Sequence, residues 1–171
     1  MPDSELPNGS RALPWWKNTR GEWYVIAQIA LFALVGMGPL LPDVALDLPA
    51  GLRIALIGAG LALLTSGGVL ALAGLLALGS NLSILPHPKA GAALVERGPY
   101  TLVRHPIYSG VILGAIGWAL LFRSPITLLI ALVLLVFFDA KSRREERWLA
   151  RAFPGYRAYQ RRVRKLIPFV Y

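Results

Sequence analysis

The sequence contains no cysteine among its 171 residues and few charged residues, and both shortages exclude classes of protein. Without cysteine there is no disulfide, no thiolate nucleophile and no cysteine-ligated metal site, and we assign no metal to the chain. Charged residues make up 16% of the chain and hydrophobic residues 56%, which is too apolar for an ordinary soluble domain. The mean hydropathy of +0.55 points the same way. The first hypothesis is therefore a protein embedded in a lipid bilayer.

Four long runs lack Asp, Glu, Lys and Arg altogether. They span residues 23–42, 54–88, 105–122 and 124–138. A helix needs about 20 apolar residues to cross a hydrocarbon core of roughly 30 Å. We therefore predict an all-α, polytopic membrane protein with four transmembrane helices, at about 23–42, 53–79, 106–122 and 125–150. The first run is long for a signal peptide and no clean cleavage site follows it, so we expect an uncleaved span.

Positive charge is distributed unevenly around these helices. Sixteen of the 18 Lys and Arg residues lie before the first helix, between the second and third, or after the fourth, and only Arg53 and Arg123 fall on the other side. Basic loops usually face the cytoplasm, so we predict that both termini and the 80–104 connection are cytoplasmic. In a bacterium this would place the protein in the cell membrane. The net charge of +9 suits anionic lipid headgroups at the membrane, and we expect no nucleic-acid partner.

The segments outside the helices have their own patterns. Residues 1–20 contain Pro, Gly, Ser and Asn without apolar periodicity, which predicts a flexible cytoplasmic arm. In residues 154–171, aromatic and aliphatic residues recur at steps of three and four with basic residues between them. This pattern predicts an amphipathic C-terminal helix on the cytoplasmic side, ended by Pro168. Glycines in the second and third helices favour close packing of their backbones.

The third and fourth helices are joined by only four residues, "FRSP" at 122–125. Such a short connection predicts an antiparallel hairpin that turns near 123–124. Residues whose numbers sum to about 247 then lie at similar depth, so "RHPIY" (104–108) should meet "DAKSRREE" (139–146) at the cytoplasmic end. Because a proline suits the first position of a helix, His105 before it should be extended.

The groups gathered at this end fit a ligand with both charges and an aromatic part. His105 and the free amides of the helix N-terminus offer donors for a carboxylate. Glu145 and Glu146 offer negative charge for an ammonium or sulfonium, and Tyr100 and Tyr108 offer aromatic faces for a cation or a purine. These are the parts of S-adenosylmethionine. A helix cap, a positive-inside anchor and surface ion pairs worth under about 1 kcal/mol each are alternative interpretations that stay open here.

Two stretches, "LVERGPYTLVRHPIYSG" and "EERWLARAFPGYRAYQRRVRKLIP", resemble the isoprenylcysteine carboxyl methyltransferase family of integral-membrane methyltransferases. Phospholipid N-methyltransferases are similar more distantly. The resemblance covers about residues 80–168. It implies an S-adenosylmethionine-dependent enzyme with a lipophilic acceptor, either a small molecule or a prenylated protein. We expect the reacting group of the acceptor to be a carboxylate, and an amine or a thiol stays open as an alternative. It also divides the chain into the 1–20 arm, the helices of 21–79 and a methyltransferase-like region, 80–171.

The resemblance also implies roles for individual residues. Carried over, and with Arg104 added as a neighbouring donor, the cofactor-binding residues are Leu94, Val95, Tyr100, Arg104, His105, Pro106, Ile107, Tyr108 and Glu145. Lys141 stands where the family often has an arginine that contacts the acceptor's carboxylate, although lysine is a point charge rather than a bidentate fork. Glu146 is expected to matter less than its neighbour, because one helical position is a rotation of about 100°. A carboxylate nucleophile needs no general base, so no acid or base is assigned.

Two other functions remain as alternatives at this stage. Membrane sterol reductases carry a motif like the first stretch, so the chain could be an NADPH-dependent membrane reductase. The paired glutamates argue against that function, because a nicotinamide phosphate would favour arginines without carboxylates nearby. A non-catalytic membrane scaffold that keeps the fold is the third possibility.

Overall fold

The computed structural model describes residues 22–40, 46–81, 91, 93–168 and 170–171. The arm expected at 1–20 lies outside these residues. The main helices are α1 (Glu22–Met37), α2 (Ala50–Leu78), α3 (Pro106–Leu121), α4 (Pro125–Ala152) and α5 (Tyr156–Arg162). Short 3-10 turns are η2 (Gly38–Leu40), η3 (Gly79–Asn81) and η4 (Gly98–Thr101). The described part of the chain contains no β-strand, and the four long helices begin and end within a few residues of the predicted bounds.

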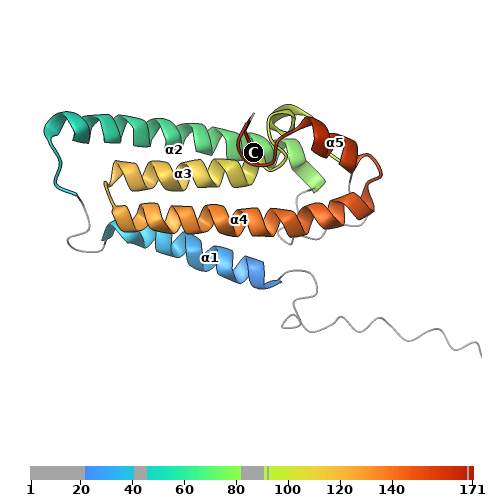
Figure 1. Cartoon of the computed structure of the whole chain (residues 1–171), viewed down its shortest axis with the longest axis horizontal. Helices are drawn as coiled ribbons and strands as arrows, with labels where there is room; N and C mark the ends of the chain where they lie inside the picture. The colour runs from blue at the N-terminus through green and yellow to red at the C-terminus, as the bar shows by residue number, and fades with distance from the viewer. Residues whose placement is uncertain (1–21, 41–45, 82–90, 92, 169) are drawn as a thin grey trace, which may run out of the picture.

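The four long helices lie side by side, in the order α2, α3, α4, α1 across the molecule (Figure 1). Three apolar segments are long enough to cross a membrane: Glu22–Leu40, Ala50–Asn81 and Pro125–Ala152. The apolar helix α3 is shorter, at 16 residues or about 24 Å. The short α5 lies at the end of the bundle where α3 begins and α4 ends (Figure 1). The chain is therefore an integral-membrane protein whose polar residues gather at one end.

The hairpin between α3 and α4 turns where the sequence predicted. Arg123 has a positive φ of 54°, which lets the chain reverse within two residues. The side chain of Ser124 then caps α4, accepting a hydrogen bond from the backbone N–H of Thr127 at 3.3 Å, and Pro125 takes the first helical position. This tight turn fixes the register of α3 against α4, and with it the pairing of side chains at the far end.

Glycine allows α2 and α3 to approach closely. Gly60, Gly67 and Gly74 are the buried residues of α2 and recur every seven positions along it. A Cβ atom at Gly67 would lie 2.5 Å from the carbonyl oxygen of Gly110, and one at Gly60 would lie 2.8 Å from that of Gly117. Neither position can hold a side chain without separating the helices. The packing role expected for these glycines is confirmed, and α2 supports the helix that carries the polar strip.

The first helix is attached more loosely. Helix α1 has no buried residue of its own. Among its contacts with α4 are the rings of Tyr24 and Phe137, with centroids 5.9 Å apart, and a hydrogen bond of 2.6 Å from Lys141 Nζ to Gln28 Oε1. Much of the surface of α1 is apolar and exposed, as expected for a helix that faces lipid.

The C-terminal segment differs from the prediction. The amphipathic helix expected over 154–171 is only seven residues long in the structure, because α5 ends at Arg162. The chain is extended at Val163, pairs with Val103 at Arg164 and bends beyond that residue. The carbonyl oxygens of Arg164 and Lys165 accept the backbone N–H groups of Arg104 and His105, at 2.8 and 3.1 Å. The extended segment therefore satisfies donors that the loop before α3 would otherwise leave unpaired.

Candidate functional site

Arg104 and His105, the two polar residues just before α3, are held in place by hydrogen bonds to the C-terminal segment. His105 has φ −127° and ψ 63°, and α3 begins at Pro106, as the sequence predicted. Both Arg104 and His105 donate their backbone N–H groups to the C-terminal segment. The hydroxyl of Ser109, one turn into α3, donates to the carbonyl of Leu166 at 2.6 Å. The His105 side chain is buried, and the hydrogen bond of its backbone N–H to Lys165 fixes where that side chain begins.

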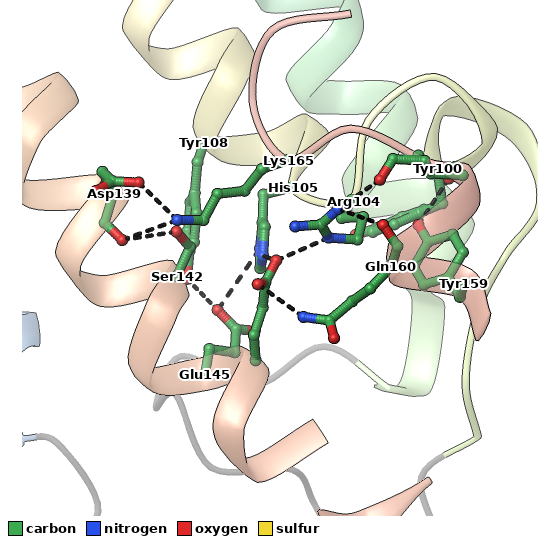
Figure 2. Close-up of polar contacts among 12 residues, drawn as sticks. Tyr100, Arg104, His105, Tyr108, Asp139, Ser142, Glu145, Tyr159, Gln160 and Lys165 are labelled. Carbon is green, nitrogen blue, oxygen red and sulfur yellow. Dashed lines mark hydrogen bonds and ion pairs between the residues drawn. The ribbon is translucent and has the colours of Figure 1, made fainter. Parts of the chain in front are cut away.

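Glu146 contacts more of the buried polar side chains near His105 than Glu145 does. Its Oε1 accepts from Arg104 Nε at 2.8 Å and lies 3.0 Å from His105 Nε2, while its Oε2 accepts from Gln160 Nε2 at 3.0 Å. Arg104 also donates to the backbone carbonyls of Gln160 and Val163 (Figure 2). The sequence predicted that Glu146 matters less than Glu145 for cofactor binding, and it did not single out Gln160. In the structure Glu146 ties α4 to α5 and to the residues just before α3.

Glu145 faces a different environment. Its Oε2 accepts a hydrogen bond from the Tyr108 hydroxyl at 2.9 Å and lies 3.8 Å from His105 Nδ1. Its side chain is 25% exposed, against 11% for Glu146. Among the described residues, Oε1 of Glu145 has no hydrogen-bond partner. Of the two glutamates, Glu145 is therefore the more exposed and has the fewer partners among the described residues.

The aromatic residues of the site are stacked on each other. The ring of Tyr108 lies between His105 and Phe138, at centroid distances of 5.3 and 4.5 Å and interplanar angles of 3° and 17°. Both faces of the Tyr108 ring are thus covered, and Tyr100 is buried as well. This arrangement does not offer the open aromatic faces that the sequence suggested for a purine. Tyr108 contributes its hydroxyl, which orients Glu145.

Tyrosines of the loop and of α5 complete the wall of the site. The hydroxyl of Tyr159 donates to the carbonyl of Tyr100 at 2.7 Å, which fastens α5 to η4. Burial raises the pKa of Tyr100, Tyr156 and Tyr159 well above the usual value, so all three hydroxyls stay protonated at physiological pH. Leu94 and Val95 are half-buried in the segment that leads into η4. Ile107 instead packs against α2 at Gly74. The contact is so close that a Cβ atom added at Gly74 would lie 2.9 Å from Cγ1 of Ile107.

Lys141 points toward α1 rather than toward water. Only 3% of it is exposed, and its Nζ lies 5.2 Å from the ring centroid of Tyr108 and 5.9 Å from that of Phe138. Its hydrogen-bond partner, Gln28, is the only amide side chain in the apolar run of 23–42. A lone polar residue in a spanning helix usually faces the protein interior. The position of Gln28 in this apolar run therefore indicates a contact inside the bundle, which the sequence analysis did not predict.

An apolar cavity of about 270 Å³ lies deeper in the bundle, between α1, α2, α3 and α4. It is lined by Phe32, Val35, Gly36, Leu64, Val111, Ala115, Trp118 and Leu134. Tyr108 and Val111 both pack against the same core cluster of α3 and α4. An apolar hollow that is largely open to the surface of the bundle therefore lies between the helices, on the membrane side of Lys141.

A second cluster of charges was not predicted. Lys165 Nζ donates to Asp139 Oδ1 at 2.6 Å, and the hydroxyl of Tyr171 donates to the same oxygen at 2.8 Å. Arg143 Nε donates to Asp139 Oδ2 at 2.8 Å. In Figure 2 the Asp139–Lys165 pair lies on the opposite side of His105 from Arg104 and Gln160. The polar end of the bundle thus contains two clusters of charged groups, one around Glu146 and the other around Asp139, with His105 between them.

The chain is similar to known methyltransferases and to a metal-resistance protein. The family model described as phospholipid methyltransferase matches residues 55–155, which includes α3, α4 and the whole RHPIY strip. Among curated proteins, the chain is 40% identical over 76 residues to the cobalt-zinc-cadmium resistance protein CzcN of Cupriavidus metallidurans. It is also 40% identical over 79 residues to the protein-S-isoprenylcysteine O-methyltransferase of Saccharomyces cerevisiae. These matches cover 44% and 45% of this chain but only 35% and 33% of the relatives.

A solved structure shares the arrangement of helices. The eukaryotic intramembrane Ras methyltransferase, isoprenylcysteine carboxyl methyltransferase, superposes with a TM-score of 0.63 at 26% sequence identity. The match covers 89% of this chain and 54% of that one. The chain therefore spans about a third of the length of the curated relatives named above and about half of the solved structure. Nearly all of it nevertheless follows one membrane-methyltransferase fold.

Proposed function

This chain belongs to the phospholipid methyltransferase family, and from that premise we propose that it is an integral-membrane methyltransferase that uses S-adenosylmethionine. The acceptor is lipophilic and presents a carboxylate, as in isoprenylcysteine O-methylation. The observation that carries the proposal is the convergence of Glu145, His105, Tyr108 and Lys141 between a polar mouth and an apolar interior. Relatives named for isoprenylcysteine O-methylation in yeast, and the matching Ras methyltransferase structure, support the same chemistry.

The residues present fit the cofactor. When bound, S-adenosylmethionine supplies a methyl group attached to a positively charged sulfur. Glu145, with one carboxylate oxygen unpaired among the described residues, would balance the positive charge of its ammonium or sulfonium. The Tyr108 hydroxyl and His105 hold that carboxylate in place. Leu94 and Val95, in the half-buried segment before η4, would form the apolar side of the pocket.

Lys141 would bind the acceptor's carboxylate. Its ammonium is held between the ring of Tyr108 and the amide of Gln28, so it is oriented before the acceptor arrives. The apolar cavity between α1, α3 and α4 would hold part of the acceptor's hydrocarbon tail. The loose packing of α1, which has no buried residue, would let such a tail enter from the bilayer. Lys141 and Glu145 are one turn apart on α4, which places the acceptor and the methyl donor next to each other.

The chain's residues contribute chiefly by positioning. An acceptor carboxylate is already ionised, so the transfer needs no group to remove a proton, and we assign no general base. Aligning the carboxylate oxygen with the methyl carbon turns a reaction between two molecules into one within a single complex. The stack of His105, Tyr108 and Phe138 fills the space beside the reacting groups and limits access of water. Orientation in the membrane, with both termini and this mouth cytoplasmic, is part of the same proposal and follows from the basic residues.

Ligand binding to the detergent-purified protein distinguishes this function from its alternatives. We expect calorimetry to detect binding of S-adenosylhomocysteine and none of NADPH. Binding of NADPH alone would indicate a reductase, and binding of neither would indicate a membrane scaffold. Either result would contradict the proposal.

A further inference from the structure

A polar cleft lies beside the proposed cofactor site and is not needed for it. Its volume is about 300 Å³, and its walls include Arg104, Arg143, Glu146, Arg164, Lys165 and Tyr171. Helix α4 contributes Arg143 and Glu146, and the extended segment after α5 contributes the last three. Glu145 does not line the cleft, because it is rotated about 100° from Glu146 around the helix. The cleft therefore opens on a different side of α4 from Glu145 and Lys141.

The cleft carries an excess of positive charge. Four cationic side chains line it, and only two carboxylates pair with them: Glu146 with Arg104, and Asp139 with Lys165 and Arg143. The side chain of Arg164 is exposed and makes no hydrogen bond with any described residue. Two positive charges are thus left without a carboxylate of their own. An anion that enters the cleft would meet at least one complete guanidinium fork.

This arrangement is held in place by the fold. The backbone of Arg164 is fixed by the N–H of Arg104, and that of Lys165 by the N–H of His105. The Lys165 side chain is itself buried and bound to Asp139. Figure 2 shows Lys165 reaching past His105 toward Asp139, from the segment that borders the cleft. The backbone of Arg164 is therefore ordered before an anion binds, and the conformational entropy lost on binding is chiefly that of its exposed side chain.

We propose that this cleft binds a phosphate group, with Arg164 and Arg143 as its principal ligands. Arginine presents planar donors that match the oxygens of phosphate. Arg164 can offer its whole guanidinium, whereas Arg143 already donates Nε to Asp139 and Nη2 to the Tyr171 hydroxyl and can offer its remaining N–H groups. The α4 residues that border it follow directly on the apolar run 124–138, which places the cleft at the level of lipid headgroups. The phosphate can belong to an anionic lipid or to a soluble phosphate compound. It would bind whether or not the chain transfers methyl groups.

Binding of short-chain lipids to the purified full-length protein tests this site. The probes are dihexanoylphosphatidylglycerol below its micelle concentration, the zwitterionic phosphatidylcholine of the same chain length, and inorganic phosphate. We expect phosphatidylglycerol to bind more tightly than phosphatidylcholine, because the trimethylammonium group beside the phosphate of phosphatidylcholine would be repelled by the cationic side chains of the cleft. We expect Arg164→Gln to weaken that binding about tenfold, and Arg143→Gln to weaken it by a similar factor. Inorganic phosphate that competes with the lipid would show that the phosphate group alone is recognised, and lipid binding without such competition would identify the lipid headgroup as the ligand.

The matched control is Arg157→Gln. Arg157 is exposed on α5 and does not line the cleft, so its substitution removes the same charge from the same end of the molecule. We expect it to leave lipid affinity within a factor of two, at constant ionic strength. Equal weakening by Arg157→Gln and Arg164→Gln would show diffuse attraction and overturn the proposal, as would equal binding of the two lipids. Thermal unfolding of each variant checks that it is folded, since all three arginine side chains are at the surface.

Discussion

Glu145 and Glu146, at the polar end of α4, contact different residues because one helical position separates them. Glu146 is buried among Arg104, His105 and Gln160, and it joins three segments of the chain. Glu145 is more exposed and bonds only to Tyr108 and, at longer range, to His105. Removing one partner of a buried ion pair leaves the other charge without compensation, which commonly costs about 3–5 kcal/mol. The two residues should therefore respond differently to the same substitution.

Glutamine substitutions separate ligand binding from folding. Glu145→Gln removes the charge but can keep the Tyr108 hydrogen bond, so we expect unchanged thermal stability. It should weaken S-adenosylhomocysteine binding by roughly ten- to a hundredfold, or about 1.5–3 kcal/mol, through loss of one charge-assisted contact. Glu146→Gln should lower the melting temperature, because Arg104 loses its carboxylate. Calorimetry and thermal unfolding of both variants make the comparison. A Glu146→Gln protein of normal stability, beside a destabilised Glu145→Gln protein, would reverse our assignment.

At the scale of helices, the sequence predicted the hairpin and the meeting of its two strips because a four-residue connection leaves no other arrangement. It did not predict the short α5, since the need of Arg104 and His105 for carbonyl partners becomes visible only in three dimensions. The covered faces of Tyr108 were missed for the same reason, because Phe138 reaches it across the hairpin. Local patterns predicted where helices begin and end, and contacts between helices decided what their side chains do.

The glycine contact between α2 and α3 can be tested with a matched pair. Gly67→Ala places a methyl group 2.5 Å from the Gly110 carbonyl oxygen, so the helices must separate. Forcing an extra methyl group into a packed interface typically costs about 1–3 kcal/mol. Gly68→Ala adds the same group one position along, where nothing lies within 4 Å. We expect Gly67→Ala to lower the melting temperature in detergent and Gly68→Ala to leave it unchanged or slightly raised. Equal effects of the two substitutions would show that close packing of α2 and α3 is not required.

For the molecule as a whole, the arrangement of helices separates two environments. At the polar end, α5 lies beside the start of α3 and the end of α4 (Figure 1), and Figure 2 shows Arg104, His105 and Glu145 close together there. The apolar cavity lies among the four long helices, and the least buried helix, α1, forms one of its walls. Lys141 stands between these two environments, with Gln28 of α1 as its partner. An enzyme that joins a water-soluble methyl donor to a membrane-borne acceptor needs such a boundary.

Methyl transfer by the purified protein in lipid nanodiscs tests the central claim most directly. The donor is S-adenosylmethionine with a labelled methyl group, and the acceptors are an N-acetylated S-prenylcysteine and its carboxamide, which lacks the reacting carboxylate. We predict that label enters the acid and not the amide. Lys141→Ala should greatly reduce this transfer while S-adenosylhomocysteine still binds, because we propose that Lys141 binds the acceptor rather than the cofactor. Absence of label in the acid, or equal labelling of the acid and the amide, would contradict the assignment of this chain as a carboxyl methyltransferase.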